Sequence, residues 1–243
     1  ILATGKLYNL KSNKLLNICG AVECIHSYSL IHDDLPCMDN DKLRRGKATA
    51  HIKYGESTAV LAGNSLLTLA FEMISDKRFK IKDKDKVLLL KKLAECSGHT
   101  GIAGGQELDL KYEKKRKNFK DIINMQRKKT GKLFSFCCFA AGQIAGKGDK
   151  ENIDLIKLGE DIGLLFQLAD DFLDVKGKSK YTGKTVNKDK KKGKSTIINL
   201  VGYNNAYDYG INLKKKILRK LEKHGNKAND LKNIVNFILE RKY

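Results

Sequence analysis

The chain has 243 residues, and its 48 Lys and Arg against 28 Asp and Glu give a formal net charge of +20. Aromatic residues make up only 7% of the chain and do not alternate with the basic runs, as a stacking platform for bases would require, so nucleic-acid binding is not expected. The longest apolar run, residues 133–145, is shorter than the ~20 residues that span a bilayer, so no membrane span is expected either.

Apolar residues recur at helical spacing along the chain, which predicts a single all-α domain over residues 1–243. A first long helix is predicted over residues 14–35. It ends at Pro36, because proline lacks the N–H of the helical hydrogen bond and disfavours helical geometry before it. The next predicted elements are a polar stretch over residues 40–46, a helix over 56–74, a charged connector over 76–86, and a helix that ends at Cys96.

Two further long helices are predicted over residues 119–145 and 151–175. The segment 176–195 is rich in lysine and glycine and has no apolar period, which is typical either of a lid that closes over a site or of a solvated loop. An amphipathic helix is predicted from Ala206 and a last helix from Asn229.

Two dense groups of aspartates carry most of the functional information. The first contains Asp33, Asp34 and Asp39, and the second contains Asp170, Asp171 and Asp174. Carboxylates this close together repel one another and need a counter-charge, for which a hard divalent cation with oxygen ligands is suited. Each group is followed by basic residues, so the pattern favours metal ions that bridge the protein to a phosphorylated substrate.

The second group has the clearer geometry. Gln167, Asp170, Asp171 and Asp174 are spaced i, i+3, i+4 and i+7, which places them on one face of a helix. Such a face can hold Mg²⁺, which takes one or two carboxylates together with water and phosphate oxygens. An acidic stripe that faces solvent has the same pattern, so this spacing alone leaves both interpretations open.

The first group gains support from its neighbours. His26 lies seven residues before Asp33 and shares its helical face, although a lone histidine is more often a core residue. Arg44 and Arg45 follow the aspartates, and arginine offers planar donors suited to diphosphate oxygens, although a solvated charge pair is also common. Taken by themselves, the following residues receive no role: Gln106, Asp109, Lys129, Thr130, Lys184 and Lys194.

The six cysteines show no CxxC spacing and no pairing with histidines. They are therefore interpreted as reduced thiols of a cytoplasmic protein, with neither a disulfide framework nor a zinc site.

Five stretches, in this order, resemble motifs of the trans-prenyltransferase (isoprenyl diphosphate synthase) family, and most of all its bacterial members that make farnesyl diphosphate. They are residues 21–67, GQELDL (105–110), KKTGKLF (128–134), FQLADDFLDV (166–175) and GKTVNKDKKKGKST (183–196). The final FILERKY is similar to the family's ending. The family's upstream Gly-Gly-Lys-x-Arg-Pro segment has no counterpart, so the first helices are expected to be missing.

The resemblance implies an isoprenoid synthase-like helical bundle around a deep central cavity, and a homodimer. It also implies roles for individual residues. The six aspartates named above would bind Mg²⁺, three ions per active site, with Mn²⁺ able to substitute. The allylic diphosphate would be held by Arg44, Lys129, Thr130, Gln167, Lys184 and Lys194, and isopentenyl diphosphate by His26 and Arg45. Lys129 would also belong to the catalytic set.

The implied reaction is the Mg²⁺-dependent head-to-tail (1'-4) condensation of isopentenyl diphosphate with dimethylallyl or geranyl diphosphate. Farnesyl diphosphate is the expected product, because Tyr28 lies five residues before Asp33, about one and a half helical turns. In similar synthases a bulky residue there is the floor that stops the growing chain. Tyr28 as a simple packing residue is the alternative.

Other functions that fit the sequence are a geranylgeranyl diphosphate synthase, a terpene cyclase and a non-catalytic subunit of a prenyltransferase heteromer. A cyclase normally mixes Asn, Ser or Thr with Glu in its second motif, whereas Asp170, Asp171 and Asp174 are all aspartates. A non-catalytic subunit tends to lose aspartates, and both groups here are complete.

Overall fold

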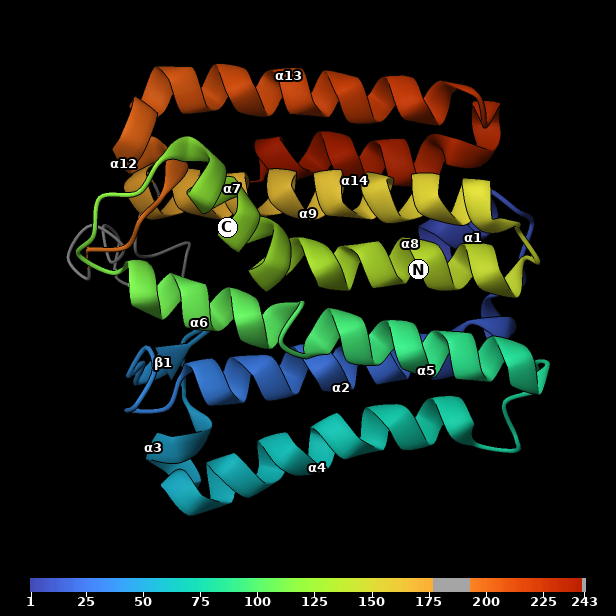
Figure 1. The fold of residues 1–243 in the computed structure, drawn as a ribbon, viewed down its shortest axis with the longest axis horizontal. Helices are drawn as coiled ribbons and strands as arrows, with labels where there is room; N and C mark the ends of the chain where they lie inside the picture. Colours follow the sequence, from blue (N-terminus) through green and yellow to red (C-terminus); the bar gives the residue numbers. More distant parts are fainter. Residues whose placement is uncertain (177–192, 242–243) are drawn as a thin grey trace.

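The computed structural model describes residues 1–176 and 193–241, and this part of the chain is built almost entirely from α-helices. Most of the long helices run roughly parallel or antiparallel to one another and form a layered bundle (Figure 1). The described elements therefore confirm the predicted all-α fold.

The elements of the first half are α1 (Leu2–Lys6), η1 (Ser12–Lys14), α2 (Leu16–Asp33), β1 (Leu43–Arg44), β2 (Lys47–Ala48), α3 (Ala50–Tyr54), α4 (Glu56–Ser75), α5 (Asp83–Ser97) and α6 (Ile102–Tyr112). Those of the second half are α7 (Phe119–Gln126), η2 (Arg127–Gly131), α8 (Lys132–Ile144), α9 (Asp149–Lys176), α12 (Ile197–Val201), α13 (Tyr203–Glu222), η3 (Gly225–Ala228) and α14 (Asn229–Glu240).

The long helices lie close to where the sequence predicts them, and the differences have local causes. Helix α2 ends at Asp33, before Pro36. This agrees with the rule that a residue preceding proline is disfavoured in the helical conformation. Helix α5 begins at Asp83, inside the predicted connector, because Asp83 and Asp85 suit the positive end of the helix dipole. The predicted polar stretch over 40–46 contains β1, which pairs antiparallel with β2.

Short elements were not predicted, because an apolar period cannot be recognised within one or two turns. These are α1, the 3₁₀ turns, the β1–β2 ribbon, α3 and α12. Helix α6, which carries Gln106 and Asp109, was not predicted as an element either.

Two apolar clusters form the core. One lies between α9, α13 and α14 and includes Leu164, Leu168 and Ile217. The other lies between α2, α4, α5 and α8 and includes Ile25 and Phe136. Helices α8 and α9 pack side by side between these two regions, so they connect the two halves of the bundle (Figure 1).

Helix α4 is the one candidate for a membrane span among the described helices, by length and composition only. Its 20 residues have a mean hydropathy of 1.3 in the most apolar window, which is enough by length and composition to cross a bilayer. Only 22% of that window is buried. Glu56 at its first position and scattered polar residues hide this stretch from a search for an uninterrupted apolar run.

Candidate active site

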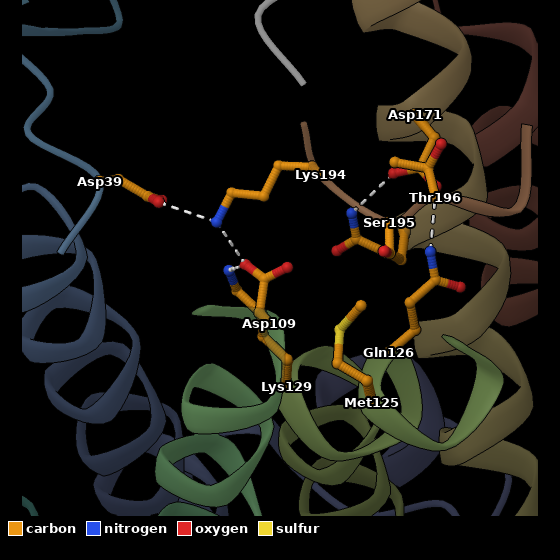
Figure 2. A pocket seen from close by; sticks show the side chains of 10 residues that line it. Asp39, Asp109, Met125, Gln126, Lys129, Asp171, Lys194, Ser195 and Thr196 are labelled. Atoms are coloured by element: carbon orange, nitrogen blue, oxygen red, sulfur yellow. Dashed lines mark hydrogen bonds and ion pairs between the residues drawn. The ribbon is translucent and has the colours of Figure 1, made fainter. Parts of the chain in front are cut away.

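A pocket opens at one end of the bundle, where α6, η2, α9 and the segment 193–196 meet (Figure 2). Its volume is about 100 Å³. The residues that line it are Asp39, Asp109, Met125, Gln126, Lys129, Gln167, Asp171, Lys194, Ser195 and Thr196. One residue from each aspartate group, Asp39 and Asp171, therefore lines the same pocket.

A π-helical turn presents the Lys-Thr pair. Helices α7 and α8 are joined without a gap by η2, a wider π-helical turn that contains Lys129 and Thr130. Such insertions are frequent at functional sites. Two glycines let neighbouring helices approach this turn: a Cβ on Gly105 of α6 would lie 2.2 Å from the Lys129 nitrogen, and one on Gly163 of α9 would lie 2.6 Å from the Gly131 Cα.

Two lysines neutralise the carboxylates on one side of the pocket. The Nζ of Lys129 donates to Asp109 at 2.6 Å, and the Nζ of Lys194 donates to the same carboxylate at 2.8 Å and to Asp39 at 3.0 Å. Burial would raise the pKa of Asp109, but these two ammonium groups lower it below its ordinary value. For the two lysines, burial would lower the pKa, and the carboxylates raise it.

Amide groups hold the carboxylate on the other side. The Nε2 of Gln167 donates to Oδ1 of Asp171 at 3.0 Å, and the Nε2 of Gln126 donates to Oδ2 at 3.0 Å. Thr130 donates to the Oε1 of Gln167 at 2.9 Å, which completes a chain of hydrogen bonds from the π turn to the second aspartate group. Asp171 is thus fixed from two different elements, while Asp174 lies one turn further along α9 and is half-buried.

The remaining aspartates take different partners. Asp34 is buried and accepts two hydrogen bonds from Arg44, at 2.6 and 2.8 Å. Asp170 turns towards α14 and pairs with Arg241 at 2.6 Å, so it and Asp171 point in different directions, although helical spacing predicts a common face. Asp33 is half-buried, and burial raises its pKa to about 6.

The structure thus brings part of the predicted site together. Asp39, Lys129, Gln167, Asp171 and Lys194 line the pocket, and Thr130 is hydrogen-bonded to it through Gln167. The predicted residues that do not line it are Asp33, Asp34, Asp170, Asp174, His26, Arg44 and Arg45. Lys184, and the predicted lid or loop over 176–195 except its two ends, lie outside the described residues.

The two predicted contacts to isopentenyl diphosphate have distinct surroundings. His26 is half-buried on α2, and burial lowers its pKa, which favours the neutral imidazole. Arg45 is exposed at the tip of the β1–β2 ribbon, with a positive φ of 52°. Its side chain is therefore accessible to a ligand, and its role stays a prediction.

Tyr28 is buried in the core of the first half. Its hydroxyl lies 3.4 Å from the backbone oxygen of Ser97, and its ring meets the His32 ring edge-on. These contacts are those expected of a packing residue. They are also compatible with a floor below the helix that carries Asp33, so its role in product length stays a prediction.

The oxygen donors around the pocket suit a hard cation. Among the described residues, no group of three or more His, Cys, Asp and Glu side chains is arranged to hold a metal. The residues nearest the pocket nevertheless offer oxygen ligands of the kind Mg²⁺ prefers. In addition, the buried Oε1 of Gln126 has no hydrogen-bond partner within the described chain. Oxygen donors and an unpaired amide oxygen fit a hydrated divalent cation.

Three residues around the pocket received no role from the sequence. Asp109 contacts both pocket lysines, Glu113 contacts Lys194 at 2.9 Å, and Gln126 holds Asp171. Asp109 and Glu113 are spaced i, i+4, so their common face was detectable in principle. No sequence pattern pointed to Gln126, because its contact spans 45 residues between separate helices.

Comparisons with known proteins agree over nearly the whole chain. A family model described as polyprenyl synthetase matches residues 1–238. The farnesyl diphosphate synthase of Escherichia coli is 39% identical over 99% of this chain and 82% of that protein. Among solved structures, a synthase from Zymomonas mobilis described as FPP/GFPP synthase has a TM-score of 0.87 at 36% identity, covering 97% of this chain and 80% of its own. A geranyltransferase from Helicobacter pylori, described as complexed with magnesium and isoprenyl diphosphate, has a TM-score of 0.84 at 34% identity, covering 98% and 82%.

Proposed function

This chain belongs to the polyprenyl synthetase family, and we propose that it is a farnesyl diphosphate synthase. It condenses isopentenyl diphosphate head to tail with an allylic diphosphate, dimethylallyl or geranyl. The observation that carries the proposal is that Asp39 and Asp171, one from each aspartate group, line one pocket together with Lys129 and Lys194.

The allylic diphosphate is the ligand that suits the lysines. Lys129 and Lys194 are positively charged at neutral pH, since neighbouring carboxylates raise the pKa of both. Gln167 adds a neutral amide donor on the adjoining wall, and Thr130 orients that amide by donating to its Oε1. Charged and neutral donors converging on one small pocket can orient a diphosphate and stabilise the negative charge that develops on it when the C–O bond breaks.

Mg²⁺ is the implied cofactor, with Asp33, Asp34 and Asp39 on one side and Asp170, Asp171 and Asp174 on the other as its ligands. When bound, the metal supplies further positive charge to the leaving diphosphate. In the structure several of these carboxylates are held by protein cations, as Asp34 is by Arg44 and Asp170 by Arg241. Metal binding would therefore exchange one set of positive charges for another.

The allylic carbocation is attacked by the double bond of isopentenyl diphosphate, and a proton is then lost. The chain needs no covalent nucleophile for this. Its residues orient two substrates and exclude water from the cation. His26 and Arg45 are the proposed contacts to isopentenyl diphosphate, and the buried ring of Tyr28 is the proposed limit to chain growth, which makes the C15 product the main one.

A homodimer is proposed from the outer face of α4 and α5. Apolar side chains are exposed there, among them Leu61 at 64% and Val87 at 63%, and α4 lies at the edge of the bundle (Figure 1). Burying such a face against a second copy would remove apolar surface from water. Light scattering should give a dimer mass for the wild type and a monomer mass for Leu61→Glu.

The free thiols suit a reducing compartment, so we place the protein in the cytoplasm.

The test is a condensation assay with isopentenyl diphosphate, each allylic primer and Mg²⁺, with products identified by chain length. We expect farnesyl diphosphate, and no product when EDTA removes the metal. Asp33→Ala and Asp170→Ala should lose most turnover while the helical circular dichroism is kept. Asp154→Ala is the control, because Asp154 is exposed on the same helix as Asp170. Near-normal activity of either site variant at saturating metal would refute the assignment.

A further inference from the structure

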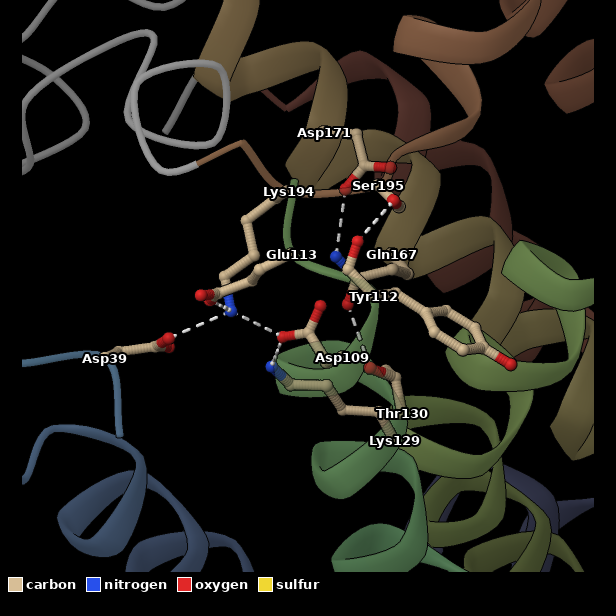
Figure 3. Close-up of polar contacts among 10 residues, drawn as sticks. All are labelled: Asp39, Asp109, Tyr112, Glu113, Lys129, Thr130, Gln167, Asp171, Lys194 and Ser195. Atoms are coloured by element: carbon tan, nitrogen blue, oxygen red, sulfur yellow. Dashed lines mark hydrogen bonds and ion pairs between the residues drawn. The ribbon is translucent and has the colours of Figure 1, made fainter. Parts of the chain in front are cut away.

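The ammonium group of Lys194 is surrounded by three carboxylates (Figure 3). Its Nζ lies 3.0 Å from Asp39, 2.8 Å from Asp109 and 2.9 Å from Glu113, and the side chain is only 8% exposed. An ammonium group has three N–H donors and no acceptor. The three contacts therefore match its donors one to one.

A lysine whose donors are all occupied cannot also donate to a diphosphate. For Lys194 to bind substrate, as its position in the pocket indicates, one carboxylate must release it. Asp39 is the carboxylate that the proposed function assigns to a metal ion, and it comes from a different part of the chain than Asp109 (Figure 3). Asp109, by contrast, lies in the last turn of α6, and Glu113 is the residue that directly follows this helix, so both are attached to the same end of α6.

The backbone around Lys194 is fixed by contacts that do not involve the Glu113 side chain. The backbone N–H of Lys114 donates to the Gly193 carbonyl at 2.8 Å. The hydroxyl of Ser195 lies 3.0 Å from the carbonyls of Tyr112 and Lys115. The segment that carries Lys194 is thus attached to the chain that follows α6, whichever side chain occupies position 113. The Glu113 side chain therefore affects only the orientation of the Lys194 ammonium group.

We propose that Glu113 is a positioning residue for the condensation. Together with Asp109 it holds the ammonium of Lys194 at the pocket after Asp39 has engaged a cation, so that the freed N–H is presented to the diphosphate of the allylic substrate. This inference rests on the proposed function, and it adds a residue to which neither the motifs nor the pocket lining assign a role.

The test compares Glu113→Gln with Glu107→Gln, which removes an exposed carboxylate from α6, the helix that Glu113 follows. One charge-assisted hydrogen bond corresponds to about a tenfold change in affinity. We therefore expect the KM for the allylic diphosphate to rise about tenfold in Glu113→Gln, with the KM for isopentenyl diphosphate and the melting temperature unchanged. Calorimetry with a non-reactive allylic thiolodiphosphate and Mg²⁺ should show the same loss without turnover.

A double-mutant cycle with Lys194→Met separates positioning from general damage. If Glu113 acts through Lys194, adding Glu113→Gln to Lys194→Met causes no further loss of analogue affinity. Independent, additive losses would overturn the proposal, as would a Glu113→Gln enzyme indistinguishable from Glu107→Gln. A wild-type protein that makes no isoprenoid product would instead refute the proposed function, so the two failures are distinguishable.

Discussion

Asp161 offers a direct test of how the π turn is held in place. It lies on α9, and its side chain is 3% exposed. One oxygen accepts from Arg127, the first residue of η2, at 2.8 Å, and the other lies 2.9 Å from Lys220 and 3.1 Å from Lys216 of α13. A single buried carboxylate thus links three elements. We expect Asp161→Asn to weaken the fold and the placement of Lys129 together.

The expected loss of stability in Asp161→Asn depends on how exposed the three basic partners of Asp161 are. Lys216 and Lys220 have side chains 56% and 36% exposed, so each can turn to water, and each pair contributes at most ~0.5 kcal/mol. The Arg127 guanidinium is 28% exposed, and losing its charge-assisted bond costs about 2 kcal/mol. We therefore expect Asp161→Asn to lower the free energy of unfolding by ~2–3 kcal/mol.

The loss should depend on pH with a definite sign. Burial would raise the pKa of Asp161, but hydrogen bonds from Arg127, Lys220 and Lys216 lower it below the ordinary value. A carboxyl with a lowered folded-state pKa stabilises the fold above its unfolded pKa of about 3.9. The stabilisation disappears as the pH falls through the folded-state pKa. The difference between wild type and variant should be constant from pH 5 to 8 and shrink below about pH 4.

Urea unfolding at several pH values measures this difference. Asp154→Asn is the matched control, since it removes an exposed carboxylate from the same helix. Equal unfolding midpoints for wild type and Asp161→Asn at pH 7 would contradict the estimate. A difference that persists undiminished at pH 3 would show that the carboxylate charge is not its cause.

Two further substitutions test the site. Gly105→Ala places a Cβ against the backbone of Lys129, so we expect kcat to fall at least tenfold. The control is Gly148→Ala, whose new Cβ meets nothing within 4 Å and which should keep wild-type turnover. Equal kcat values for the two variants would mean that the π turn can shift to accommodate the Cβ without loss of activity. Tyr28→Ala should shift the product from C15 to C20 or longer, as measured by product chromatography. Tyr28→Phe loses only the hydroxyl contact and should keep the C15 product. An unchanged product from Tyr28→Ala would place the limit to chain length on another helix.

The sequence predicts the long helices well, because their apolar period runs over many turns. Helix α4, predicted over 56–74, spans Glu56–Ser75, and α9, predicted over 151–175, spans Asp149–Lys176. The break inside the predicted helix 119–145 was not foreseeable. A π turn changes the hydrogen-bond register without changing composition, and here it is held by close helix approaches at Gly105 and Gly163 that only the tertiary structure shows.

For the site, the sequence predicts residue types better than partners. Asp39, Asp171 and Lys194 were singled out by motif, and all three line the pocket. What they touch was not predictable, because Lys194 reaches Asp39 across 155 positions of the chain. A helical-wheel argument also treats a face as uniform. It therefore could not show that Asp170 turns to Arg241 while its neighbour Asp171 turns to the pocket.

The charge arrangements at Asp161 and at Lys194 are opposite, and the contrast explains why one is structural and the other belongs to the site. At Asp161 one carboxylate is shared by three cations, so the protein itself supplies more than enough charge to keep it ionised. At Lys194 one ammonium is shared by three carboxylates. Even with Lys129 added, the local negative charge is in excess, and such a pocket repels a bare diphosphate. Divalent cations held between the carboxylates and the diphosphate would supply the missing positive charge, so that the same residues could bind an anionic substrate.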